Sequence, residues 1–174
     1  MTRGGLTVLS VGTFLLFVGM VGGFTGPMLR EAEGLLPFDL RPGGYTPADV
    51  PIYIDALSAH GRRLYFWWIQ PLDTIFPICL ALSLTLVARR VLARWSAQVV
   101  AVLALTGMAM DLAENAMLAR MLNGGDPALA LWASYATTLK WGADLLALSL
   151  VAWGLVWAIL QGPGPHNGRP LQGE

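Results

Sequence analysis

The sequence predicts an all-α protein, a four-span transmembrane helix bundle with a short outer amphipathic helix in the first loop. Three observations support this prediction. Hydrophobic residues make up 55% of the 174 residues and charged residues only 13%, which is about half the charged share of a typical soluble domain. Four apolar segments reach the about 20 residues that a helix needs to cross a bilayer. None of them shows the polar face that a surface helix of a soluble bundle would carry.

The four spans are expected at about residues 6–26, 64–88, 96–119 and 128–160. They form a single transmembrane domain, residues 1–160, and the tail 161–174, rich in Gly and Pro, is expected to be disordered. The first apolar run is about 20 residues, longer than the about 7–15 of a signal peptide, so it is interpreted as a retained span. The fourth begins after Asp126-Pro127, a typical N-cap followed by a first-turn proline.

The first loop contains the signals of a short helix of its own. Thr46-Pro47-Ala48-Asp49 supplies a capping threonine, a first-turn proline and an early acid. Val50, Ile54 and Leu57 then fall on one face, and His60-Gly61 is a stop signal. We expect an amphipathic helix on the outer membrane surface, which covers the mouth of the bundle or lies in the interface.

Orientation is predicted from the arginines. Arg89, Arg90 and Arg94 gather in one short connection without an acid, which is typical of a cytoplasmic loop. The total numbers of arginines on the two sides are equal, so the density of this connection decides the prediction. A multi-pass protein of the cell (inner) membrane with cytoplasmic N- and C-termini is expected.

Composition excludes several classes of function. Eleven basic and eleven acidic residues cancel, so no basic field would attract nucleic acid. The single cysteine, Cys79, excludes an internal disulfide and a CxxC redox pair. No nucleophilic triad, phosphate loop or dinucleotide fingerprint occurs. Asp73, Asp111 and Glu114 have the charge to bind a metal ion, but these carboxylates lack the spacing of a metal motif. Neither a metal nor another cofactor is therefore expected. The lipid bilayer is the one certain partner; an apolar or lipid ligand, a second copy and another membrane protein remain candidates.

Ionisable groups inside the spans are the candidate site, because each costs about 2.5–3.5 kcal/mol to insert. Helical spacing puts one polar stripe on each of three spans. The stripes are Gln70, Asp73 and Thr74; Asp111, Glu114 and Asn115; and Thr137, Lys140, Trp141 and Asp144. With adjacent spans antiparallel, Asp73 and Asp111 both lie roughly 13 Å inside the same boundary. The stripes are therefore expected to form one polar layer in the outer half of the bilayer.

Charge accounting sharpens this expectation. Four acids face the single lysine, and full ionisation would bury about three negative charges, which is too costly in a low dielectric. At least one carboxyl is expected to carry a proton at pH 7. Lys140 is expected to pair with Asp111 on the adjacent span, with Asp144 on its own helix as the alternative. The same groups would also fit a purely structural role, in which Thr74 or Asn115 bonds carbonyls freed by Pro71 and Pro77.

Three functions fit the pattern. The first is a ligand-binding or proton-coupled site at the polar layer. The second is an intramembrane enzyme that modifies a lipid or isoprenoid, with a protonated carboxyl as donor and Trp67, Trp68, Trp132 or Trp141 stabilising a developing cation. The third is a non-catalytic assembly partner of another membrane protein.

Four stretches carry a resemblance. They are Pro37-Phe38-Asp39-Leu40-Arg41-Pro42-Gly43-Gly44-Tyr45, Leu72-Asp73-Thr74-Ile75-Phe76-Pro77, Asp111-Leu112-Ala113-Glu114-Asn115 and Thr138-Leu139-Lys140-Trp141. Together they resemble a group of four-helix bacterial integral membrane proteins. The resemblance covers about residues 34–141 and implies the fold; it brings no activity with it.

Overall fold

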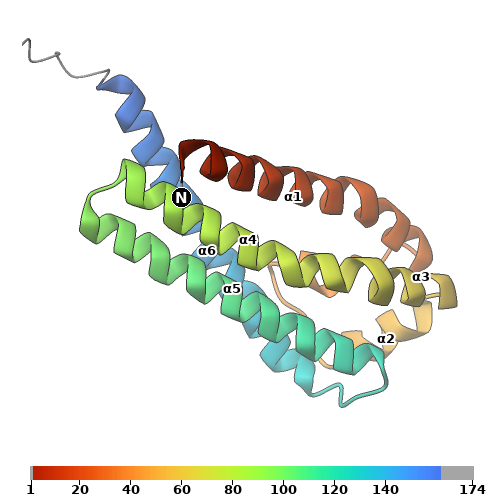
Figure 1. Ribbon diagram of the computed structural model, residues 1–174. Coiled ribbons are helices and arrows are strands. Elements are labelled where there is room, and N and C mark those ends of the chain that lie inside the picture. Colours follow the sequence, from red (N-terminus) through yellow and green to blue (C-terminus); the bar gives the residue numbers. More distant parts are fainter. Residues whose placement is uncertain (1, 162–174) are drawn as a thin grey trace, which may run out of the picture.

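The computed structural model describes residues 2–161, and its regular structure is all helical, without a strand in that range (Figure 1). Four helices, counting Ala59–Val91 as one continuous helix, are long and apolar enough to cross a membrane. The predicted disordered tail lies outside the described residues from position 162 onward. The elements in chain order are α1 (Arg3–Glu31), η1 (Phe38–Leu40), α2 (Asp49–Ala56), α3 (Ala59–Leu64), η2 (Tyr65–Ile69), α4 (Gln70–Val91), α5 (Arg94–Leu122) and α6 (Leu129–Leu160).

The first three spans are longer than predicted, because polar residues continue each helix beyond the apolar run, whereas the fourth, Leu129–Leu160, matches its predicted range to within one residue. The second span joins three elements. It runs over Ala59–Val91 as α3, η2 and α4 without a break, and η2 is a single π-helical stretch. Pro71 lies two residues after the end of η2 and cannot donate a backbone hydrogen bond, so the looser turn lets the chain enter α4 without ending the helix.

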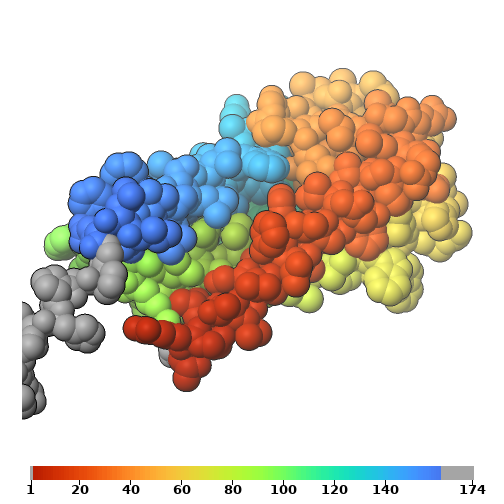
Figure 2. Space-filling model, turned by 90° about the horizontal axis from the view of Figure 1, so that it is seen from above, coloured from red at the N-terminus to blue at the C-terminus, as the bar shows by residue number. Residues whose placement is uncertain are grey.

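The core of the bundle is made by α4, α5 and α6, while α1 packs on α4. Small buried side chains between the three central helices allow close approach: Ala81, Ala88, Ala97, Ala104 and Ala147. The contact of α1 with α4 includes a buried hydrogen bond between Thr13 Oγ1 and Ser83 Oγ, 3.1 Å apart. The space-filling view shows α1 crossing one face, with α4 visible between it and α6 (Figure 2).

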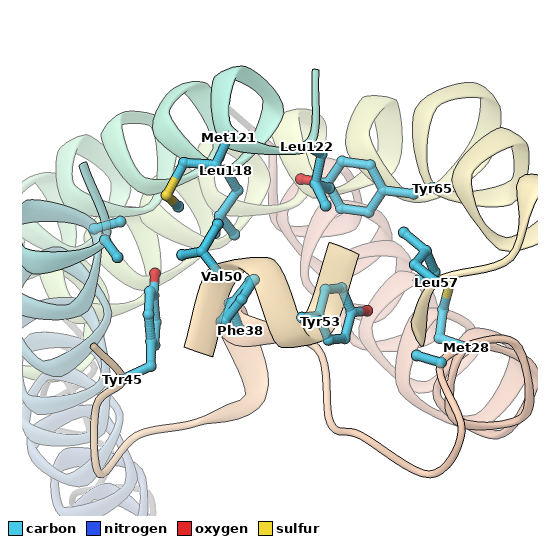
Figure 3. Packing of buried hydrophobic residues seen from close by; sticks show 13 residues of the cluster. Met28, Phe38, Tyr45, Val50, Tyr53, Leu57, Tyr65, Leu118, Met121 and Leu122 are labelled. Atoms are coloured by element: carbon cyan, nitrogen blue, oxygen red, sulfur yellow. The ribbon is translucent and has the colours of Figure 1, made fainter. Parts of the chain in front are cut away.

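The first loop is a folded unit that closes one end of the bundle (Figure 3). Its aromatic and aliphatic side chains are buried against α1, α5 and α6 in one hydrophobic cluster, which includes Phe38, Tyr45, Val50, Tyr53 and Leu57 from the loop. The rings of Phe38 and Tyr45 lie 4.6 Å apart, and those of Phe38 and Tyr53 lie 4.8 Å apart. A loop that buries this much apolar surface holds a fixed position on the bundle.

Two expectations about this loop were wrong in detail. Thr46 does not cap α2 with its hydroxyl. Its backbone N–H and its Oγ1 both donate to Asp49 Oδ2, at 2.7 Å each, and α2 begins at Asp49 itself. His60 and Gly61 do not end a helix either, because Ser58 accepts a bond from Gly61 N and caps α3 instead. Gly61 is needed for close packing: a Cβ there would lie 2.6 Å from the Cβ of Glu31.

Candidate functional site

The site is centred on Lys140, which α6 projects toward two carboxylates of α5. Lys140 Nζ lies 3.0 Å from Asp111 Oδ1 and 2.7 Å from Glu114 Oε2. The three side chains are 10%, 6% and 0% exposed, so the ion pairs are buried. The expected pairing of Lys140 with Asp111 is present. Glu114 was expected in the polar layer, but its direct ion pair with the lysine was not anticipated.

Glu114 is held on its other oxygen by the hydroxyl of Thr137. Thr137 Oγ1 lies 2.5 Å from Glu114 Oε1, 2.9 Å from the carbonyl of Ala133 and 3.5 Å from the hydroxyl of Tyr45. Both carboxylate oxygens of Glu114 therefore have polar neighbours on α6. A buried carboxylate with both oxygens occupied is fixed in orientation.

Asn115 joins α5 to α4 at the point where a proline interrupts α4. Pro77 has no N–H, so the carbonyl four residues earlier, that of Asp73, loses its helical partner. Asn115 Nδ2 donates to this carbonyl at 2.9 Å. The hypothesis that Asn115 satisfies a carbonyl freed by proline is thus correct. Asn115 Oδ1 is buried without a hydrogen-bond partner among the described residues, so it remains available as an acceptor inside the bundle.

Asp144 and Trp141 occupy different surroundings from Lys140. Asp144 forms no ion pair with Lys140 in the described structure; its carboxyl lies against Gly107 of α5, where a Cβ would come within 2.8 Å of Asp144 Cγ. Trp141 Nε1 donates to the backbone carbonyl of Asp39 at 3.3 Å. Gly107 is therefore the residue that admits Asp144 between α5 and α6.

Of the polar stripe on α4, which consists of Gln70, Asp73 and Thr74, only part lies in the site. Asp73 is buried, and its carboxyl is within electrostatic range of Asp111, Lys140 and Glu114. Gln70 is half-buried, and Thr74 is exposed, with its hydroxyl on the carbonyl of Gln70 at 2.8 Å. Thr74 thus satisfies its own helix and does not join the cluster.

Sequence reasoning expected a loop helix over the mouth of the bundle but missed the contribution of Asp39 and Tyr45 to the site. Tyr45 N donates to Ser134 Oγ of α6 at 3.0 Å, so the loop is held to α6 at Ser134 as well as at Trp141. Asp39 then lies within electrostatic range of Lys140, Asp73, Asp111 and Glu114. The only signal for this in the sequence was the Pro37–Tyr45 stretch, which was used for the resemblance and not for the site.

Asp39 differs from the other carboxyls because it belongs to a loop. Burial raises its pKa above the ordinary 3.8, and this effect exceeds the lowering by Lys140, by the backbone N–H groups of Asp39 and Leu40, and by Arg41. The guanidinium of Arg41 is engaged elsewhere: it donates to the carbonyl of Leu36 and lies 4.7 Å from the centre of the Phe38 ring.

We name the five carboxyls Asp39, Asp73, Asp111, Glu114 and Asp144, together with Lys140, the carboxyl cluster. Full ionisation would place five negative charges around one ammonium group, which leaves four of them uncompensated, with Arg41 at the edge. Such a cluster is stable only with bound protons, water or a cation. Within residues 2–161, no group of three or more His, Cys, Asp or Glu is arranged to hold a metal ion.

Comparison with protein-family models, with curated proteins and with solved structures gives no match for this chain. The interpretation of the site therefore depends on its own geometry and charge.

Proposed function

We propose that this protein is a proton-coupled binding protein of the membrane, in which the carboxyl cluster holds a proton and exchanges it for a ligand that carries a positive charge. The observation that supports this most is the charge imbalance. Lys140 is already occupied by Asp111 at 3.0 Å and Glu114 at 2.7 Å, so Asp39, Asp73 and Asp144 have no share of it at ion-pair distance. A proton or an organic cation would complete the site.

The folded loop supports the proposal in a second way. A site that served only to join helices would need no cover, whereas here residues of the loop close the cluster on one side through Trp141, Ser134 and Thr137. Exclusion of water strengthens electrostatic interactions inside. We propose that α2 is the outer amphipathic helix of this cover, since it buries Val50 and Tyr53 and exposes Ile52.

We also propose that the covered end faces the outside of the cell membrane, with both termini cytoplasmic. Figure 1 shows the N-terminus of α1 and the end of α6 beside the turn from α4 to α5. That turn carries Arg89, Arg90 and Arg94, and arginines near short connections favour the cytoplasmic side.

The alternative of a lipid- or isoprenoid-modifying enzyme has less support. It needed tryptophans beside the carboxyls, but Trp67, Trp68 and Trp132 are among the most exposed side chains. Trp141 is the exception, and its Nε1–H is used to hold the loop.

The test uses octylammonium as a cationic probe and octyl sulfate as its anionic counterpart of equal chain length. Purified protein in a weakly buffered non-ionic detergent is titrated with each probe near pH 7, while a pH indicator records proton release. We expect octylammonium to release about one proton per protein and octyl sulfate to release none. The Asp39→Asn/Asp73→Asn variant should lose this release. Binding of octylammonium without proton release, or equal behaviour of both probes, would contradict the proposal.

A further inference from the structure

A cavity lies at the end of the bundle opposite the carboxyl cluster, at the turn between α4 and α5. It has a volume of about 400 Å³ and is lined by Arg89, Leu92, Arg94, Ala97, Gln98 and Ala101. The two arginines reach it from different helices, the last turn of α4 and the first residue of α5. The cavity is therefore a feature of the folded turn and not of one helix alone.

Among the described residues, the charged side chains at this end are all basic. No Asp or Glu occurs between Asp73 and Asp111. The described residues of α1 and α6 near this end, 2–20 and 146–161, contribute Arg3 and no acid. An anion at the cavity would meet Arg89 and Arg94 without repulsion from a nearby carboxylate of the described chain. Arginine pairs can hold phosphate through two parallel hydrogen bonds each.

The start of α5 adds donors of its own. Its N-cap, Ala93, has no side chain that could bond the first-turn N–H groups. These groups carry the positive end of the helix dipole. Gln98 of the next turn also lines the cavity, so its carboxamide can donate to the same anion.

The rest of the cavity is apolar and fixed. Leu92 packs against Gly154 of α6, which holds the turn on the bundle. Ala97 is buried, and Ala101 continues the apolar wall into the span. Next to the cavity, Trp95 is 80% exposed, the position of a tryptophan that lies at the level of lipid head groups. Exposed Val99, Val102 and Leu105 extend from there along α5.

We propose that this cavity binds the phosphate head group of an anionic membrane lipid, with the acyl chains along the exposed apolar side chains of α5. Basic pockets between transmembrane helices at one membrane face bind such head groups. The combination of two guanidinium groups, a carboxamide and an adjoining apolar surface favours a lipid phosphate over a free phosphate ion. This site is separate from the carboxyl cluster, and its test does not depend on the proposed function.

The test compares phosphatidylglycerol with phosphatidylcholine, added at equal mole fraction to the delipidated protein in detergent, and with inorganic phosphate alone. Retained lipid is counted by native mass spectrometry, and thermal unfolding is followed in parallel. We expect retention of phosphatidylglycerol and a higher unfolding temperature with it. Phosphatidylcholine and inorganic phosphate should have little effect.

Three double variants locate the effect. Arg89→Gln/Arg94→Gln should weaken phosphatidylglycerol binding about 30-fold, from about a factor of five for each arginine. Arg30→Gln/Arg63→Gln removes the same charge from exposed positions at the other end and should leave binding unchanged. Arg89→Lys/Arg94→Lys keeps the charge but loses the paired hydrogen bonds, so its affinity should lie between the two and it reports on the site even if the glutamine variant unfolds.

Three results would overturn the proposal. The first is equal retention of the two lipids. The second is equal weakening by the cavity variant and the control variant, which would show an effect of net charge alone. The third is stabilisation by inorganic phosphate to the same extent as by phosphatidylglycerol, which would make the cavity a site for a free anion.

Discussion

Removing the ammonium group of Lys140 should destabilise the protein strongly, and by an amount that depends on pH. Lys140→Met leaves Asp111 and Glu114 without their partner, and the exposed fractions of the three side chains, 10%, 6% and 0%, leave little room for solvent screening. Breaking a buried pair in this way costs about 3–5 kcal/mol. The two carboxylates can avoid this cost only by taking up protons.

The pH dependence follows from the cost of that protonation. Protonating a carboxyl costs about 1.4 kcal/mol for each pH unit above its ordinary pKa of about 4. At pH 8 protonating the carboxyl costs at least as much free energy as leaving the carboxylate unpaired, so the full loss of about 3–5 kcal/mol is expected. At pH 5 it falls to about 1 kcal/mol per carboxyl. The unfolding temperature of Lys140→Met should therefore approach that of the wild type as the pH is lowered.

The geometry also specifies which compensating substitution works. Lys140→Met/Asp111→Leu still leaves Glu114, which is fully buried, without a cation. Only Lys140→Met/Asp111→Leu/Glu114→Leu removes every charge of the network, and Thr137 keeps its bond to the carbonyl of Ala133 at 2.9 Å. The triple variant should recover most of the lost stability, and the double variant only part of it.

Thermal unfolding in detergent at pH 5 and pH 8 measures these differences. A loss of 3–5 kcal/mol corresponds to a fall of roughly 6–20 °C for a chain of this size. Thr138→Met, on the exposed face of α6, serves as the control and should change stability by less than about 0.5 kcal/mol. Equal stability of the double and triple variants, or strictly additive losses, would refute the three-residue network.

Three further predictions concern the loop and the orientation. The pKa of Asp39 is raised in the folded protein. The protonated Asp39 side chain therefore contributes its full stability below the ordinary pKa of 3.8, and this contribution is lost as the pH rises through the raised pKa. Asp39→Asn should remove that part of the pH dependence of the unfolding temperature. Val50→Ala removes a side chain from the buried face of α2. It should lower the free energy of unfolding by about 1–3 kcal/mol and raise hydrogen exchange over residues 38–57. Unchanged exchange would show that the loop is not packed as described. Single cysteines can be introduced at Gly43 and at Ala93, which are both exposed, in a Cys79→Ser background. An impermeant thiol reagent should label position 43 in intact cells. Labelling of position 93 alone would reverse the proposed orientation. Gly43 is preferred to Gly44, since Gly44 has φ +90° and a Cβ there would lie 2.8 Å from Ser134 Oγ.

The spans could be predicted from the sequence because their signal is local. A run of about 20 apolar residues needs no knowledge of its neighbours to be recognised, and four such helices are present. The Asn115 bond to the carbonyl of Asp73 was predictable for a related reason: a proline frees a carbonyl at a fixed distance along the chain, and few side chains on the adjacent helix can reach it.

The contribution of the loop could not be predicted in the same way. Asp39 reaches the cluster because Phe38, Tyr45 and Tyr53 are buried among side chains of three helices, and which of those contacts form depends on the packing of the whole bundle. The choice between Asp111 and Asp144 as partner of Lys140 was similarly open, because Asp144 lies one helical turn from Lys140 and Asp111 lies at comparable depth on the adjacent span. Gly107 of α5 decides the position of Asp144, and nothing local connects residues 107 and 144.

The central claim is that the carboxyl cluster holds a proton at neutral pH. Infrared spectroscopy of the protein in lipid nanodiscs, titrated from pH 5 to pH 8, measures this directly through the carbonyl stretch of protonated carboxyl groups. We predict a protonated-carboxyl band at pH 7 that shifts in D₂O and disappears in the Asp39→Asn/Asp73→Asn variant. A wild-type spectrum without such a band at pH 7, or a band that persists unchanged in this variant and in Lys140→Met/Asp111→Leu/Glu114→Leu, would contradict the account.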